Sequence, residues 1–262
     1  LEQASRLSVA AQHAGRFARA GLQRVADLGC GIGGDALALA SLDLVVTAVE
    51  RDEVTAALAA YNLAPFPTAT VVHGDALAQP LDDIDGVWLD PARRSGAMRL
   101  ASPDDWSPSL TQALELAQRR PTGIKLAPGM HRSLLPEGLE AQWVSVDGEV
   151  VELVLWSGAL TRPGVGRAAL VLRGDGAPAE LRSAADSADV APGALGEYVY
   201  EPDGAVIRAR LIGDLARSMG GRMLDASIAY VTTDTAAPTP FARGFRVLER
   251  LPLDVARLGR AL

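Results

Sequence analysis

A cluster of glycines in residues 25–40, "VADLGCGIGGDALALA", is the part of the sequence best suited to hold a ligand. It lies between a short apolar run and a helical pattern, where glycine lets the backbone turn sharply and lets a ligand approach without obstruction by Cβ atoms. Gly29, Gly31 and Gly34 match G-x-G-x-x-G, which is typical of dinucleotide sites. Gly29, Gly31 and Gly33 match G-x-G-x-G, which is typical of methyl-donor sites. The spacing alone leaves both ligands open.

The charge of Asp27, two residues before the first glycine, favours the methyl donor. A dinucleotide would bring its pyrophosphate close to this carboxylate, and like charges repel in a partly desolvated site. S-adenosylmethionine has no phosphate and carries a sulfonium and an ammonium, both of which a carboxylate attracts. The sequence therefore predicts a binding site for S-adenosylmethionine.

Two further acidic residues end the next two predicted strands. Glu50 lies 23 residues after Asp27, where a carboxylate can accept hydrogen bonds from both ribose hydroxyls. Asp75 follows one strand later and is placed to accept a hydrogen bond from the adenine amino group. Because the carboxyl ends of parallel strands meet at one edge of a sheet, we expect these side chains and the glycine loop to form one site.

The elements that must position these residues follow an alternating pattern. Short apolar runs alternate with helical patterns, which indicates βαβ units and a parallel sheet with helices on both faces. A helix is also expected before the first strand, and because the chain begins inside it, we expect an upstream segment. A hairpin with its turn at Asp147 and Gly148 is expected to complete the sheet antiparallel at one edge. The predicted strands are 24–28, 44–50, 69–75, 86–91 and 122–128, and the predicted helices are 34–42, 52–64 and 107–120.

Glycine and proline cluster in "GALTRPGVGR", residues 158–167, where we place a domain boundary. Residues 1–159 are then expected to form an α/β domain with an N-terminal helix, and residues 160–262 a small α+β domain. A chain of 262 residues is long enough for two modest domains.

Composition narrows the class of protein. No apolar run approaches the roughly 18 residues of a membrane span, and no signal-peptide pattern opens the chain, so we expect a cytoplasmic protein without a membrane partner. The single cysteine, Cys30, excludes an internal disulfide and a cysteine-rich zinc site, and the three histidines show no ligand spacing. We therefore expect no metal, and we interpret Cys30 as a small residue that fills the loop.

Four segments, "DLGCGIGGDALALA", "AVERDE", "HGDAL" and "WLDPARRSG", resemble the class I S-adenosylmethionine-dependent methyltransferases. More closely, the chain is similar to a bacterial family in which this domain precedes a THUMP-like domain, which "EYVYEPDGAVIRARL" and "AYVTTD" with "PFARGFRVLE" resemble. The glycine loop is distantly similar to that of trimethylguanosine synthases. The resemblance implies a Rossmann-like sheet and S-adenosylmethionine as cofactor, bound by Asp27, Gly29, Gly31, Gly33, Glu50, Arg51, Asp75, Ala76 and Asp90.

The segment "LDPARRSG" lies at the end of the fourth predicted strand. In the class I methyltransferases that the chain resembles, this strand end faces the transferable methyl group. Relatives that methylate amino groups carry a polar residue, two prolines and an aromatic residue there. Asp90 and Pro91 fit this pattern, whereas Ala92 and Arg93 depart from it. We expect Asp90 to orient an acceptor amine and offset its developing positive charge. Arg93 or Arg94 is expected to stack its guanidinium plane or grip a phosphate in place of the aromatic residue.

Some side chains near this segment have a second interpretation. Arg93 and Arg94 could equally pair with the aspartates that follow in the loop. Trp106 is a better candidate to stack on a base than Trp88, which we expect in the core. Lys125, the one lysine of the chain, could line the acceptor pocket, but at the end of its strand it is expected to face solvent.

The predicted second domain contains a cluster of arginines, and clustered arginines can contact the phosphates of a nucleic acid. Together with the resemblance to THUMP domains, this cluster implies structured RNA, such as tRNA or rRNA, as acceptor and partner. Residues 160–262 carry a net charge of only +1, however, and residues 1–159 carry −8, so a solvated surface fits as well. A methyltransferase for a small molecule or protein therefore remains an alternative. So does a cofactor-binding, RNA-associated factor without transfer activity. The arginines concerned are Arg208, Arg210, Arg217, Arg222, Arg243, Arg246 and Arg250.

Overall fold

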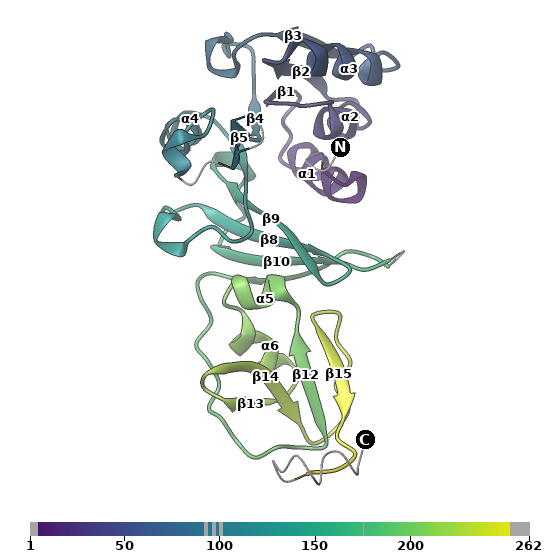
Figure 1. Ribbon diagram of the computed structural model, residues 1–262, viewed down its shortest axis with the longest axis vertical. Coiled ribbons are helices and arrows are strands. Elements are labelled where there is room, and N and C mark those ends of the chain that lie inside the picture. Colours follow the sequence, from purple (N-terminus) through teal and green to yellow (C-terminus); the bar gives the residue numbers. More distant parts are fainter. Residues whose placement is uncertain (1–4, 92–93, 96–97, 100–101, 175, 252–262) are drawn as a thin grey trace. The chain divides into compact units, whose positions relative to one another are not determined.

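The computed structural model describes residues 5–91, 94–95, 98–99, 102–174 and 176–251 (Figure 1). The chain divides into two compact units. The first contains residues 1–144 and 151–165, and the second contains residues 145–150 and 166–262. The tip of a β-hairpin thus groups with the second unit.

The first unit is built on a sheet with the strand order β8-β9-β7-β4-β1-β2-β3. The strands from β7 to β3 are parallel, and β9 pairs antiparallel with β7. The chain runs from β1 outward to β3 and then returns to place β4 on the other side of β1. The carboxyl ends of β1 and β4 therefore form a topological switch point, where ligands bind in open α/β sheets. The bounds are β1 (Arg24–Leu28), β2 (Val45–Glu50), β3 (Ala69–His73), β4 (Gly86–Leu89), β7 (Thr122–Leu126), β8 (Glu140–Val146) and β9 (Glu149–Trp156).

Helices pack on this sheet, as the alternating pattern predicts. The first two pack on each other, α3 packs on β2 and β3, and α4 packs on β7. Local signals fix two helix starts: the Asp52 carboxylate accepts from the Thr55 amide before α3, and Ser109 forms a capping box with Gln112 before α4. The predicted α/β class is confirmed. The elements are α1 (Leu7–Arg19), α2 (Gly34–Ala40), α3 (Glu53–Leu63) and α4 (Leu110–Arg119), the short helices η1 (Ala76–Ala78), η2 (Pro103–Asp105), η3 (Arg132–Leu134) and η4 (Gly158–Leu160), and the short strands β5 (Arg94–Ser95) and β6 (Met98–Arg99).

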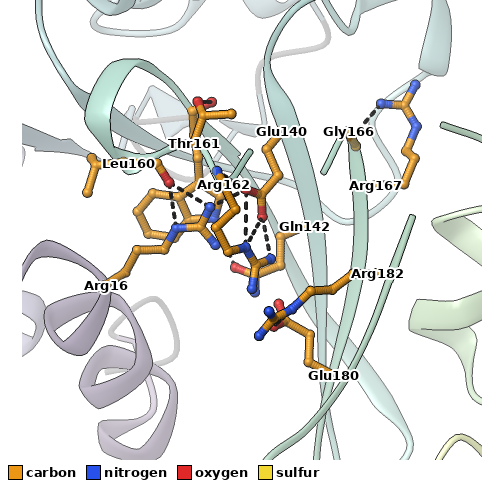
Figure 2. A network of polar contacts seen from close by, with 11 residues as sticks. Arg16, Glu140, Gln142, Leu160, Thr161, Arg162, Gly166, Arg167, Glu180 and Arg182 are labelled. Carbon is orange, nitrogen blue, oxygen red and sulfur yellow. Dashed lines mark hydrogen bonds and ion pairs between the residues drawn. The ribbon is translucent and has the colours of Figure 1, made fainter. Parts of the chain in front are cut away.

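A buried ion cluster joins α1 to the strands that end the first unit (Figure 2). The Glu140 carboxylate on β8 is fully buried and accepts hydrogen bonds from the guanidinium groups of Arg16 and Arg162. Arg16 also donates from Nε to the carbonyl oxygen of Leu160 at 2.8 Å, and its guanidinium lies 4.5 Å from the ring centre of Trp156. Each buried charge is therefore partnered, which gives this cluster a structural role.

The second unit holds an antiparallel pair, β10 with β11, and a four-stranded antiparallel sheet with the order β13-β14-β12-β15 (Figure 1, green to yellow). Side chains of Tyr200, Met223 and Val231 are buried on one face of the larger sheet, where α6 packs on β13. This arrangement is a small α+β unit. Its elements are β10 (Arg167–Leu172), β11 (Ala179–Ser183), β12 (Tyr198–Pro202), α5 (Gly204–Arg208), α6 (Ile212–Ser218), β13 (Arg222–Asp225), β14 (Ile228–Thr233) and β15 (Ala242–Arg246).

None of the helices in the described part of the chain has the length and apolar character needed to span a bilayer.

Candidate functional site

The glycine loop between β1 and α2 is tied to the end of the neighbouring strand. The amides of Gly29 and Cys30 both donate to the carbonyl oxygen of Val49, at 2.9 and 3.0 Å. Gly29 has a φ of 85°, and a Cβ added there would lie 2.8 Å from the carbonyl oxygen of Asp90. Gly31 also has a positive φ, but an added Cβ would meet nothing within 4 Å. The loop thus packs against the chain after β4 at Gly29 and presents open backbone at Gly31, where a ligand can approach.

The Glu50 carboxylate at the end of β2 is fixed beside this loop. One oxygen accepts from the Gly31 amide at 3.0 Å and the other from the Asp52 amide at 2.9 Å. The Asn62 side chain on α3 donates to the carbonyl oxygen of Ile32 at 2.9 Å and holds the loop from the other side. Both Glu50 oxygens keep a lone pair with which they can accept from ribose hydroxyls. Asn62 was not predicted, since no spacing links it to the loop.

The end of β3 lies next to the end of β2, because Glu50 pairs with His73 in the parallel register. Asp75 follows two residues later, and its carboxylate accepts from the Leu77 amide at 2.8 Å, which starts η1. Arg51, which is exposed, and Ala76, which is half-buried, lie near the same strand ends. The structure therefore brings the residues predicted to hold ribose and adenine to one edge of the sheet.

Asp27, at the carboxyl half of β1, is buried, and neither of its carboxylate oxygens has a hydrogen-bond partner within the described residues. Burial raises its pKa well above the usual value, and the charges of Asp35 and Asp90 raise it further. The Lys125 charge and the Ala36 amide lower this pKa, but by less. An unpartnered buried carboxylate is costly in free energy, and a cationic ligand would stabilise it. The residue fits the sulfonium and ammonium groups of S-adenosylmethionine.

Asp90, directly after β4, forms an ion pair with Lys125 near the end of β7. The Lys125 ammonium donates to Oδ2 of Asp90 at 2.7 Å. Burial lowers the pKa of Lys125, but the charges of Asp90 and Asp35 outweigh burial and raise it. The prediction that Lys125 faces solvent is wrong: the side chain is buried in an acidic environment. The available signal was a lysine, the one in the chain, inside an apolar strand.

Behind this pair, buried polar side chains continue toward α1. The Ser5 hydroxyl accepts from Lys125 at 3.0 Å and donates to Oδ2 of Asp35 at 2.5 Å. His13 bonds from Nδ1 to Asp35 at 2.8 Å and from Nε2 to Glu152 at 2.6 Å. Burial lowers the pKa of His13, but the two carboxylates outweigh it and raise the pKa to about 9, so the ring is an imidazolium. We call this cluster the polar row: Asp90, Lys125, Ser5, Asp35, His13 and Glu152.

Other predicted residues have different outcomes. Pro91 is buried beside Asp90, while Arg93 lies outside the described residues and its role stays a prediction. Trp106 is buried, which does not favour the prediction that it stacks on a base, whereas Trp88 lies in the core as predicted. Burial raises the pKa of the Cys30 thiol, which favours its interpretation as a loop filler. Within the described ranges, no three His, Cys, Asp or Glu side chains are placed to hold a metal ion.

Known proteins that are similar to this chain over nearly all of its residues include a sequence relative and a solved structure. The chain is 34% identical over 272 residues to an uncharacterized S-adenosylmethionine-dependent methyltransferase of Mycobacterium tuberculosis, found in strains H37Rv and CDC 1551. This match covers 100% of the chain and 72% of the relative. A solved structure assigned as a methyltransferase of Porphyromonas gingivalis W83 has a TM-score of 0.77 and 24% identity, covering 99% of this chain and 69% of that one. No protein-family model matches the chain.

Proposed function

The chain belongs to the S-adenosylmethionine-dependent methyltransferases, and from this premise we propose that it methylates a nitrogen atom of structured RNA, such as tRNA or rRNA. The cofactor, when bound, supplies an electrophilic methyl group on a sulfonium. The observation that carries the proposal is the placement of Asp90. Its carboxylate is held by Lys125 and its backbone packs against the glycine loop at Gly29, so an acceptor N–H bonded to Asp90 would lie beside the cofactor.

The residues that would hold the cofactor follow from the charges and contacts at the strand ends. Asp27 would attract the sulfonium and the ammonium, since its buried carboxylate lacks a partner within the described residues. Glu50 would accept hydrogen bonds from the ribose hydroxyls. Asp75 would accept one from the adenine amino group. Gly31 would let the ligand approach the backbone.

Asp90 would act on the acceptor in two ways. Its carboxylate would accept a hydrogen bond from the acceptor nitrogen and so turn the nitrogen lone pair toward the methyl carbon, because in-line displacement depends on positioning. It would also offset the positive charge that develops on nitrogen as the N–C bond forms and the C–S bond breaks with its electron pair left on sulfur. The methylated nitrogen then loses its proton to water.

Support for RNA comes from the exposed face of the four-stranded sheet in the second unit. Phe245 pairs with Val199, and Val199 pairs with Thr232, so these side chains share one face. Tyr230 lies two residues before Thr232 and projects to the same side. Phe245 is 42% exposed and Tyr230 37% exposed, and the Arg243 guanidinium lies 5.0 Å from the centre of the Phe245 ring. Unpaired bases stack on aromatic rings and on arginine planes of this kind.

Three arginines of the predicted cluster have two kinds of surroundings. Arg217 pairs with Asp214 at 2.6 Å, and Arg222 pairs with Asp234 at 2.8 and 2.9 Å, so these charges are already compensated. Arg243 instead lies against an exposed ring. The RNA proposal therefore rests on this sheet face rather than on all seven arginines. The THUMP-like character of residues 160–262, the domain boundary before residue 160, and the likeness to trimethylguanosine synthases stay sequence-based parts of the proposal.

The proposal is tested by transfer of tritiated methyl groups from S-adenosylmethionine to fractionated bacterial extract. We expect label in material that nuclease degrades, and we expect it to disappear in Asp27→Ala and Asp90→Ala. Asp82→Ala, which replaces an exposed aspartate of the same unit, is the matched control and should retain transfer. Phe245→Ala should raise KM for the RNA about tenfold while leaving cofactor affinity unchanged, because one stacking contact is worth about 1–3 kcal/mol.

Two outcomes would contradict this assignment. Label in protease-sensitive or small-molecule material would support the alternative acceptor class, which the net charge of −8 over residues 1–159 favours. Absence of label despite cofactor binding would indicate a binding factor without transfer activity.

A further inference from the structure

The polar row runs from the Asp90 carboxylate to Asp35 on α2 and on to His13 and Glu152. We propose that Lys125 is a positioning residue for methyl transfer: it fixes the Asp90 carboxylate and, through the Ser5 hydroxyl, ties it to Asp35 on the helix that follows the glycine loop. This inference rests on the proposed role of Asp90 at the methyl acceptor.

The register of two strands explains how Lys125 and Asp90 meet. Leu89 pairs with Ile124 where β4 runs parallel to β7. Asp90 and Lys125 each follow by one residue, so they occupy equivalent positions on neighbouring strands and their side chains reach each other at 2.7 Å. The two partners of the ion pair therefore lie on the adjacent strands β4 and β7, next to the switch point, and neither is carried on a long loop.

The two partners differ in exposure in the direction that a positioning role requires. The Lys125 side chain is 9% exposed and the Asp90 side chain 25% exposed. The ammonium thus lies inside, while the Asp90 side chain is partly accessible to an acceptor. Burying a lysine charge carries a desolvation cost that an apolar residue of similar size would avoid. A role in orienting the partly exposed Asp90 carboxylate would explain why a lysine is buried at this position.

The row also alternates in charge from Asp90 to Glu152. Lys125 contacts Asp90 and Ser5, and Ser5 contacts Asp35, which in turn contacts the His13 imidazolium. Glu152 accepts from the far side of that imidazolium. Each carboxylate of the row therefore contacts a cation or the bridging hydroxyl. A substitution at Lys125 should therefore alter the contacts of Asp35 at the start of α2 as well as the position of Asp90.

The first test compares Lys125→Met and Lys125→Arg with the wild type. For tritiated methyl transfer into the labelled fraction of bacterial extract, we expect Lys125→Met to lower kcat about tenfold, with KM changed less. The acid limb of the pH–rate profile should move up by about one pH unit, because the carboxylate loses its neighbouring cation. Lys125→Arg keeps the charge and should recover most of kcat. Calorimetry should give cofactor affinities within about threefold of wild type.

A second readout does not depend on turnover. Hydrogen–deuterium exchange over residues 29–40 should accelerate in Lys125→Met, and also in Ser5→Ala, which keeps both charges and only removes the bridge. The matched control is Arg162→Met, which breaks the ion pair with Glu140 in the same unit outside the row. This control should lose stability without faster exchange in the glycine loop and without a shifted pH profile. If Lys125→Met does not fold, Ser5→Ala and Lys125→Arg carry the test.

The outcomes separate this inference from the proposed function. Transfer that survives Asp90→Asn would overturn the role of Asp90 and with it this inference. Transfer lost in Asp90→Asn but unchanged in Lys125→Met, with an unshifted pH profile, would overturn the inference alone. A Lys125→Met variant that resembles Arg162→Met in every readout would show that the pair serves stability only.

Discussion

Asp27 shows how one side chain can favour ligand binding over stability. Its pKa is raised by burial and by Asp35 and Asp90, so the folded protein loses stability as the pH rises from the usual aspartate value through the raised one. At neutral pH, Asp27→Asn should therefore raise the free energy of unfolding by about 1–3 kcal/mol. The same substitution should weaken S-adenosylmethionine binding about tenfold or more.

Urea denaturation of the ligand-free protein and calorimetric titration with the cofactor measure the two effects. Asp82→Asn, at an exposed site, should change neither quantity. A destabilised Asp27→Asn protein would mean that the carboxylate has a stabilising partner in the ligand-free fold.

His13 makes stability depend on pH in the neutral to alkaline range. Its pKa is about 9 in the folded chain, against 6.5 for an ordinary histidine. The imidazolium's contribution is fully present below pH 6.5 and is lost as the pH rises through 9, a change of about 3 kcal/mol in the free energy of unfolding. His13→Gln should remove this dependence. Denaturation series from pH 6 to pH 9.5 measure it, and a wild-type curve as flat as that of the variant would show that the ring stays neutral.

At the scale of elements, two glycines with similar backbone angles distinguish the effect of backbone strain from the effect of a close contact with a neighbouring segment. Gly29 and Gly21 both have positive φ values, 85° and 74°. An added Cβ meets the Asp90 carbonyl oxygen at 2.8 Å at Gly29 but nothing within 4 Å at Gly21. Alanine at either position should cost about 1–2 kcal/mol of backbone strain. Only Gly29→Ala should also displace the chain after β4 and weaken cofactor binding, which denaturation and calorimetry would detect; equal effects at both glycines would refute this contact.

The Glu140 cluster should act on stability alone. Glu140→Ala leaves Arg16 and Arg162 without their buried carboxylate, and breaking a buried ion pair costs about 3–5 kcal/mol. Cofactor affinity, measured by calorimetry at a temperature at which the variant is folded, should stay unchanged. Glu137→Ala, at an exposed position, serves as the control for thermal melting. A melting temperature equal to that of the control would mean that the cluster adds no stability.

The sequence predicted those elements and site residues whose signals are local. The strand predicted at 24–28 matches β1 residue for residue, and the hairpin turn at Asp147 and Gly148 has both residues at positive φ. Lys125 and His13 were misjudged or missed because their partners lie 35 and 139 residues away. Burial beside a distant carboxylate leaves no periodic trace in a sequence.

At the scale of the whole molecule, charge limits how RNA can be bound. The chain has a net charge of −7, and two of the cluster arginines are paired with aspartates. Binding through the Phe245 face should therefore depend weakly on salt, with a slope of log affinity against log salt near −2, as expected for about two or three phosphate contacts. Fluorescence anisotropy with a labelled single-stranded RNA measures this slope.

Arg243→Ala should lower the RNA affinity about tenfold through lost stacking, whereas Arg119→Ala, an exposed arginine of the first unit, should not. If log affinity fell steeply with log salt and Arg243→Ala bound RNA as tightly as the wild type, the RNA would bind on another surface.

The contact of His13 with Glu152 has a consequence for biosynthesis. The glycine loop and Asp27 leave the ribosome early, but the imidazolium that supports Asp35 lacks its second carboxylate until 139 further residues have been made. Contacts of such long sequence separation close slowly. Nascent chains that stop before β9 would carry the full glycine motif without the finished polar row, so competence for methyl transfer should arise late in translation, as a property of the nearly completed first unit.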